Sequence, residues 1–389
     1  MRWLSNVRLP EAVPPCSPGH WRVGVDTAGT IACLEPLEAG SAAAGDDWIG
    51  DWLSPAGVDL QINGGLGLAF PELTDADLPR LLELLELLWR DGVEAISPTL
   101  VTCGVAPLRQ ALAVLRTARA LPAPGRARLL GAHLEGPFLA KARRGAHPEA
   151  HLALPSLAAL QARIEGFESE IALMTLAPEL DGAEAVIAAL CAQGIVVSLG
   201  HSEASERQAQ HAFEAGVGML THAFNAMPGL HHRAPGPVAA AVLRGDVAMG
   251  LIADGVHVAP SQAVLLQRLA PRQVVLVSDA LAPYGLPEGR HRWDSRSLLV
   301  ENGSCRLEDG TLAGVTLPLL EGVVRLAGWS RAPGAAIAAA TVLPRRVLGD
   351  HRPVQELLLG QPLAEALRWS GGDVDPLRWR RAGAATRTP

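Results

Sequence analysis

Short apolar runs alternate with longer amphipathic segments from Gly57 onwards. The short runs have the length of buried strands, whereas apolar residues in the longer segments recur with the period of a helix. Eight such runs alternating with helical segments predict an α/β fold, a (β/α)8 TIM-type barrel. The predicted strands are Val58–Ile62, Val93–Ser97, Arg128–Leu134, Ile171–Leu176, Ile195–Leu199, Gly218–Thr221, Val247–Ile252 and Val274–Val277.

The two ends of the chain break this rhythm. Since chain ends often lie close together, we predict that residues 1–54 and 345–389 form one small β-sandwich domain. Residues 55–344 would form the barrel, with a turn-rich, strand-like excursion at about 290–312 before its last helix. The strands expected near the N-terminus are Trp21–Val25, Thr30–Leu34 and Trp48–Leu53, and helical patterning returns after the excursion at Leu317–Gly328 and Ala335–Leu348.

Composition narrows the class of protein. With 389 residues, 49% of them hydrophobic, the chain has material for a large barrel and a smaller domain. The net charge of -7 argues against a nucleic-acid binder, which would carry a basic surface. The Leu-rich run Leu78–Trp89 contains three charged residues and is expected to be an amphipathic helix, not a membrane span. Five widely spaced cysteines, and an N-terminus without an apolar signal segment, fit a cytoplasmic protein.

Titratable side chains stand at five of the eight predicted strand ends. In a barrel of this kind the C-terminal strand ends form the reactive face. One carboxylate with two imidazoles is a known zinc set that leaves room for water and substrate. We therefore predict a divalent metal ion bound by Glu135, His201 and His222. The strand ends carry Glu135 (third strand), His201 (fifth), His222 (sixth), Asp254 and His257 (seventh) and Asp279 (eighth).

A carboxylate beside such a metal can take a proton from water, because the metal lowers the pKa of that water to about 7. Asp279, at the eighth strand end, is the candidate for this role. His133 shares a strand face with Glu135, and a structural role fits it as well as a chemical one. Cys103 has no histidine partner nearby in the sequence, which favours a structural role.

Two Gly- and Pro-rich loops on the same predicted face carry basic side chains. Arg and His in such loops suit an anionic ligand such as phosphate. The segment after Glu135 contains Lys141, Arg143, Arg144 and His147, and the segment after His222 contains Asn225, His231, His232 and Arg233.

Ten short motifs, in this order, resemble the N-acetylglucosamine-6-phosphate deacetylase branch of the amidohydrolase superfamily. The resemblance spans nearly the whole chain and includes the strand-like excursion. The motifs are LSPAGVDLQINGG at 53–65, GAHLEGPFL at 131–139, RRGAHPE at 143–149, TLAPE at 175–179, SLGHSEAS at 198–205, THAFNAM at 221–227, HRAPGPV at 232–238, ADGVHV at 253–258, VSDA at 277–280 and DGTLAG at 309–314.

The resemblance implies a cytoplasmic, homodimeric hydrolase of amino-sugar metabolism. It would cleave the acetamide of N-acetyl-D-glucosamine 6-phosphate and release glucosamine 6-phosphate and acetate. By position, Glu135, His201 and His222 match the metal ligands, Asp279 the catalytic acid/base and His147 the residue that polarises the acetyl carbonyl. The implied substrate contacts are His147, Asn225, Ala226, Arg233, His257 and Leu312, with Arg233 and His257 near the phosphate and the arginine supplied by the neighbouring subunit.

Many amidohydrolases carry His-x-His after the first strand and bind two metals, but this chain has Asp59-Leu60-Gln61 there. We therefore expect one divalent ion per subunit, zinc foremost and otherwise iron, cobalt or manganese. Gln61 is expected to hold a water or to contact a metal ligand. Val315, where the family usually has serine, and the C-terminal segment depart from the family pattern.

Two alternatives remain open. One is an amidohydrolase for another N-acetylated amino-sugar phosphate, such as the galactosamine isomer. The other is a non-catalytic sugar-phosphate-binding protein on the same fold, against which Asp279 argues because binding alone needs no acid/base.

Overall fold

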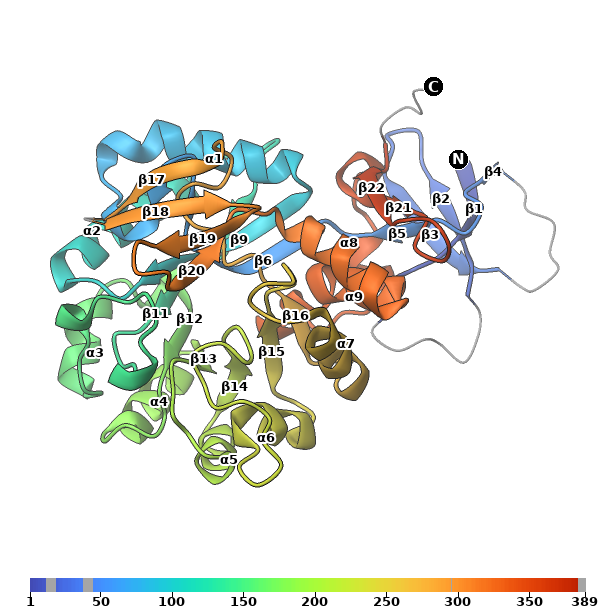
Figure 1. Cartoon of the computed structure of the whole chain (residues 1–389). Helices are drawn as coiled ribbons and strands as arrows, with labels where there is room; N and C mark the ends of the chain where they lie inside the picture. The colour runs from blue at the N-terminus through green and yellow to red at the C-terminus, as the bar shows by residue number, and fades with distance from the viewer. Residues whose placement is uncertain (12–18, 38–44, 295, 384–389) are drawn as a thin grey trace. The chain divides into compact units, whose positions relative to one another are not determined.

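Two compact units make up the chain, Met1–Val58 with Val323–Pro389 and Asp59–Gly322 (Figure 1). Each has its own cluster of buried apolar side chains. The computed structural model describes residues 1–11, 19–37, 45–294 and 296–383.

The larger unit contains a nearly closed barrel of eight parallel strands, so the predicted TIM-type fold is confirmed. The ends of its sheet meet where Asp279 N–H donates to the Gln61 carbonyl at 2.9 Å and Asn63 N–H to the Ala280 carbonyl at 2.7 Å. The eight strands are β6 (Gly57–Ile62), β9 (Val93–Val101), β11 (Ala132–Glu135), β12 (Ile171–Leu176), β13 (Val196–Leu199), β14 (Val217–Leu220), β15 (Ala248–Leu251) and β16 (Val274–Leu276).

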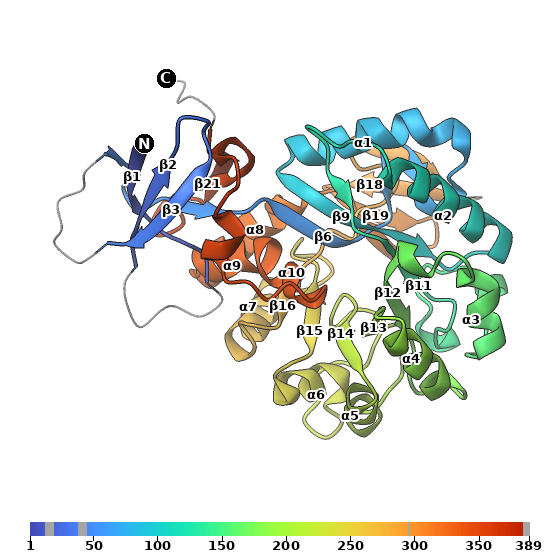
Figure 2. The same cartoon turned by 180° about the vertical axis from the view of Figure 1, so that it is seen from behind.

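A helix follows each barrel strand in the chain, and helices α1 to α7 lie on the outer side of the barrel (Figure 2). Helix α1 buries Leu81, Leu84, Leu85 and Leu88, whose spacing forms one apolar stripe. No helix of the described residues is long and apolar enough to cross a membrane. The helices are α1 (Leu78–Arg90), α2 (Val105–Arg119), α3 (Leu157–Ile164), α4 (Ala183–Ala192), α5 (Glu206–Glu214), α6 (Gly236–Arg244), α7 (Pro260–Leu269) and α8 (Leu319–Ser330).

The excursion between β16 and α8 is an antiparallel sheet of four strands in chain order. Its inward side chains, Trp293, Leu298, Val300 and Cys305, are buried with Leu281 from the end of the barrel. The sheet therefore packs over the reactive face. Its strands are β17 (Gly289–Trp293), β18 (Arg296–Glu301), β19 (Ser304–Leu307) and β20 (Leu312–Val315).

The smaller unit joins both ends of the chain in two sheets, ordered β3-β2-β1-β4 and β22-β21-β5. Their shared core includes Leu4, Val23, Ile31 and Leu53. The unit also holds helices α9 (Pro333–Thr341), α10 (Leu343–Val347) and α11 (Val354–Leu358). The strands are β1 (Arg2–Val7), β2 (Trp21–Val25), β3 (Ile31–Pro36), β4 (Asp46–Asp47), β5 (Trp52–Ser54), β21 (Leu367–Ser370) and β22 (Arg378–Arg381).

One local prediction is wrong in this unit. Trp48–Leu53 is not one strand, because the Asp47 carboxylate accepts the Ile49 N–H at 2.8 Å and Ile49 adopts a left-handed φ of 55°. The chain turns there, and β5 begins only at Trp52. The helical patterning expected over Ala335–Leu348 is confirmed as two helices, α9 and α10, with Pro344 in the first turn of α10, where its missing N–H costs nothing.

Candidate metal centre

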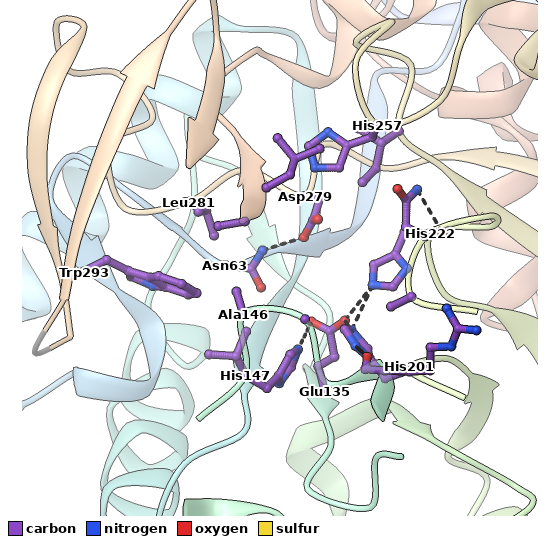
Figure 3. Close-up of a pocket in the computed structure, with 18 of the residues that line it drawn as sticks. Asn63, Glu135, Ala146, His147, His201, His222, His257, Asp279, Leu281 and Trp293 are labelled. Atoms are coloured by element: carbon purple, nitrogen blue, oxygen red, sulfur yellow. Dashed lines mark hydrogen bonds and ion pairs between the residues drawn. The ribbon is translucent and has the colours of Figure 1, made fainter. Parts of the chain in front are cut away.

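Three of the predicted strand-end residues converge in one cavity (Figure 3). Glu135 is the last residue of β11, while His201 and His222 each stand two residues beyond the ends of β13 and β14. Their side chains are only 3–6% exposed. The parallel register of the barrel therefore brings three groups, far apart in the sequence, to one buried point.

The backbone at these strand ends is held in an unusual conformation. His201 has φ 49°, His222 φ 29° and Asp279 φ 50°, in the left-handed region that non-glycine residues seldom adopt. Such conformations carry a cost and cluster at functional sites, where the surrounding structure enforces them. The left-handed conformations lower the stability of the fold, but they direct these three side chains into the cavity.

The three ligand atoms form a nearly equilateral triangle. Glu135 Oε1 lies 3.0 Å from His201 Nε2 and 3.1 Å from His222 Nε2, and the two nitrogens are 3.1 Å apart. Atoms that bind one tetrahedral ion at about 2.0–2.2 Å lie roughly 3.3–3.6 Å from one another, and a small outward movement of these side chains reaches that spacing. The triangle fits a single divalent ion.

The tautomer of His201 also fits. Its Nδ1 lies 2.8 Å from the Arg143 carbonyl oxygen, which can only accept, so Nδ1 carries the hydrogen. Nε2 is then the nitrogen that can present a lone pair toward Glu135 Oε1. A lone pair facing a carboxylate oxygen at hydrogen-bond distance calls for a cation between them, and orientation through a backbone carbonyl is usual for metal-binding histidines.

A second trio, Glu135, His147 and His201, also has ligand atoms within 4.8 Å of one another. His147 Nδ1 lies 2.9 Å from Thr102 Oγ1 and 3.3 Å from the Thr102 backbone nitrogen, so Thr102 holds this side of the ring and Nε2 faces the centre. Burial lowers the pKa of His147 to about 3, so the ring stays neutral. His147 Nε2 is 3.9 Å from Glu135 Oε2, whereas the Nε2 atoms of His201 and His222 are 3.0 and 3.1 Å from Glu135 Oε1, which favours the trio with His222.

Asp279 faces this centre from the end of β16 (Figure 3). Burial and then the negative charge of Glu135 raise its pKa to about 6, although His222, His257 and Asn63 partly oppose the shift. Its Oδ1 accepts from Asn63 Nδ2 at 2.7 Å and from Gln61 Nε2 at 3.2 Å. A carboxylate with this pKa is ionised near pH 7 and can still be protonated during a reaction.

Gln61 lies between the two carboxylates, because its Nε2 is also 3.4 Å from Glu135 Oε1. The neighbouring Asp59 is 1% exposed, and its Oδ1 accepts the backbone N–H groups of Gln61 and Ser278 at 3.2 Å. Burial raises the pKa of Asp59 to about 7. These contacts tie the Asp59-Leu60-Gln61 stretch to the eighth strand end.

The cavity has a volume of about 280 Å³. Five of the predicted substrate contacts line it: His147, Asn225, Ala226, His257 and Leu312. His257 is fixed by Asp254, whose carboxylate lies 2.7 Å from its Nδ1. Arg233 is exposed and is absent from the lining, and its Nε donates to His232 Nε2 at 2.9 Å.

His133 lies in the barrel interior below the cavity lining. It is 2% exposed, its Nε2 is 2.7 Å from Thr175 Oγ1, and burial lowers its pKa to about 4. Sequence reasoning missed Asn63 and Trp293. Asn63 directly follows β6, but its amide does not titrate, so a search for titratable strand ends passed over it. Trp293 lies on the excursion and carried no signal.

The chain is similar in sequence and in structure to deacetylases of amino-sugar phosphates. No protein-family model matches the chain. The chain is 35% identical over 325 residues to N-acetylgalactosamine-6-phosphate deacetylase of Escherichia coli, covering 82% of this chain and 83% of that protein. It is 35% identical over 319 residues to N-acetylglucosamine-6-phosphate deacetylase of Mus musculus, covering 79% and 77%. A structure of N-acetyl-D-glucosamine-6-phosphate deacetylase from Mycobacterium smegmatis, a variant in complex with N-acetyl-D-glucosamine-6-phosphate, superimposes with a TM-score of 0.80 at 27% identity over 98% of both chains.

Proposed function

Because the chain belongs to the N-acetylglucosamine-6-phosphate deacetylase family, we propose that it hydrolyses the acetamide of N-acetyl-D-glucosamine 6-phosphate to glucosamine 6-phosphate and acetate. One observation carries the proposal beyond family likeness. The cavity joins the triangle of Glu135, His201 and His222 to a buried carboxylate, Asp279, with a raised pKa. A protein that only binds a sugar phosphate could use a metal ion in this triangle, but it would not need a buried acid/base such as Asp279.

Glu135, His201 and His222 are proposed to hold one divalent ion, zinc foremost. Two neutral imidazoles and a carboxylate are the donor set of catalytic zinc, which keeps a position open. When bound, the ion polarises the acyl carbonyl and lowers the pKa of water at the site. His222, held against the carboxylate of Glu135 at 3.1 Å, completes the triangle that His201 begins.

Asp279 is proposed to move the proton. Its carboxylate takes a proton from the attacking water, and the resulting acid gives that proton to the nitrogen of the leaving amine. Asn63, at 2.7 Å, holds Oδ1 during both steps. His147 donates its Nε2–H to the acyl oxygen, on which negative charge develops as water adds.

The remaining polar residues are proposed to bind the sugar phosphate. Asn225, Ala226, His257 and Leu312 line the same cavity. Arg233 is exposed, which suits a homodimer in which Arg233 of the partner subunit reaches the phosphate. We also place the protein in the cytoplasm, which fits the free thiols of Cys33, Cys103, Cys191 and Cys305.

The galactosamine isomer is the second candidate substrate, since one relative at 35% identity is named for it. Acetate release across N-acetylglucosamine and N-acetylgalactosamine, each with and without the 6-phosphate, tests the proposal. We expect the glucosamine 6-phosphate derivative to have the highest kcat/KM and both unphosphorylated sugars to be poor. If no acetate came from either phosphate, a non-catalytic binding protein would be the better conclusion.

A further inference from the structure

One side of the active cavity is apolar and belongs to a packed cluster. Val101, Ala146, Leu281, Trp293 and Ala313 line the cavity, and all five are also members of the core cluster under the excursion sheet or pack against it. The rest of the lining includes the carboxylates, imidazoles and amide already described. The cavity therefore has one polar wall and one apolar wall. The apolar wall belongs to a close-packed core, so its side chains cannot easily move aside for a larger ligand.

Trp293 is the largest residue of this side and is clamped in place. It pairs across the β17–β18 hairpin with Arg296, whose Cζ lies 4.5 Å from the centroid of the Trp293 ring. Arg296 Nη1 donates to the Ala146 carbonyl at 2.6 Å, and its Nη2 lies 2.5 Å from Asp294 Oδ2. Because Ala146 directly precedes His147, the contacts of Arg296 with Trp293 and with the Ala146 carbonyl hold the indole in place beside the loop that carries His147.

The apolar wall of the cavity and the histidines His222 and His257 lie on opposite sides of Asp279 (Figure 3). In Figure 3, Trp293 and Leu281 lie on the side away from His222 and His257, with Asn63 and Asp279 between them. In the proposed reaction the scissile carbonyl must lie between the metal triangle and Asp279. The sugar phosphate then extends toward His257, and the acyl chain extends the other way.

We propose that Trp293, held by Arg296, is the wall that meets the acyl group and restricts the enzyme to short N-acyl chains. The inference rests on the proposed deacetylase function and names the acyl part of its substrate. A sugar-stacking role fits less well, because a stacking indole presents an open face. Trp293 is 3% exposed, no more than about 8 Å² of its surface, which matches a methyl group but not a pyranose ring.

The test compares kcat/KM for N-formyl, N-acetyl, N-propionyl and N-butyryl glucosamine 6-phosphate, with release of glucosamine 6-phosphate as the common readout. For the wild type we expect each methylene beyond acetyl to lower kcat/KM by about 10- to 200-fold. Trp293→Ala should raise the butyryl-to-acetyl ratio at least tenfold. An unchanged ratio in a folded variant would overturn the inference.

Inhibition by glucosamine 6-phosphate, which has no acyl group, tests whether Trp293 contacts the acyl group or the sugar ring. Trp293→Ala should change its inhibition constant less than threefold, and a tenfold loss would instead assign the indole to the sugar. Ala313→Val covers the case in which Trp293→Ala does not fold, because added bulk on the same side should favour formyl over acetyl. No change in that ratio would count against the wall.

Two further variants test the role of Arg296 and provide a control for the loss of a tryptophan. Arg296→Met removes the charge and the bond to Ala146 while retaining bulk, so it should relax acyl selectivity in the same direction but less than Trp293→Ala. Trp379→Ala, a tryptophan of the smaller unit, is the matched control and should leave the acyl ratios unchanged. If wild-type enzyme released no product from any of the four compounds, the proposed function would fail; normal acetyl turnover with unaltered ratios would refute the acyl wall alone.

Discussion

Replacing Asp279 with asparagine removes the proton carrier and little else. The side chains have nearly the same shape, and the amide oxygen can still accept from Asn63 Nδ2, now 2.7 Å from Oδ1. The three proposed ligands are untouched. The variant should therefore fold, keep its metal content and bind substrate.

The size of the loss follows from the two roles of Asp279. A positioned acid or base typically contributes 10²–10⁴-fold, and Asp279 serves as base for the water and as acid for the amine. We expect kcat to fall by about 10⁴-fold. Because the pKa of Asp279 is raised to about 6, roughly thirty carboxylates exist for each acid at pH 7.5, so the wild type is close to fully active there.

The pH profile provides the decisive assay. The base must be ionised, so wild-type kcat/KM should fall about tenfold per pH unit below pH 6. This acidic limb should be absent from the residual activity of Asp279→Asn. Activity within tenfold of the wild type, or a variant that retains the same acidic limb, would refute the acid/base role.

Three further changes test other parts of the site. Glu135→Gln should lower metal affinity by at least about 100-fold, measured by metal analysis after dialysis, and full retention of metal would refute the ligand triangle. His147→Gln should lower kcat by about 10²–10³-fold with metal content unchanged, whereas loss of metal would identify His147 as a ligand. Asn63→Leu removes a hydrogen bond to the charged form of Asp279, so its pKa should rise and the acidic limb of kcat/KM should move up by about 1–2 pH units; an unmoved limb would show that Asn63 does not act on Asp279.

The barrel was predictable because its signals are local. Buried strands and amphipathic helices alternate in the sequence, and Leu81, Leu84, Leu85 and Leu88 bear out that pattern in α1. The candidate site was predictable for a topological reason. Parallel strand ends meet on one face, so Glu135 and Asp279 could be assigned to one site without any contact being known.

The parts that were missed depend on contacts between distant segments. The resemblance placed Leu312 of the excursion at the sugar site, but the residues near Trp293 do not show that this part also folds over the reactive face. That arrangement depends on the packing of Leu298 and Val300 with Leu281. The orientations of the His147 and His201 rings could not be derived either. They depend on contacts of His147 with Thr102 and of His201 with the Arg143 carbonyl, which become visible only in three dimensions.

The smaller unit shows the limit of periodicity. A short apolar segment such as Trp48–Leu53 has the composition of a strand, but the Asp47 side chain competes for the backbone and forms a turn. Composition does not reveal this competition, because the same aspartate could equally face solvent.

The proposed reaction is metal-dependent deacetylation at the triangle of Glu135, His201 and His222. Its most direct test is acetate release from N-acetyl-D-glucosamine 6-phosphate by enzyme as purified, after removal of metal with a chelator, and after addition of one equivalent of a divalent ion. We predict turnover, its loss on chelation and its recovery at one ion per subunit, with one glucosamine 6-phosphate formed per acetate. Undiminished turnover by folded, metal-free protein, or no acetate from the metal-loaded enzyme, would contradict the claim.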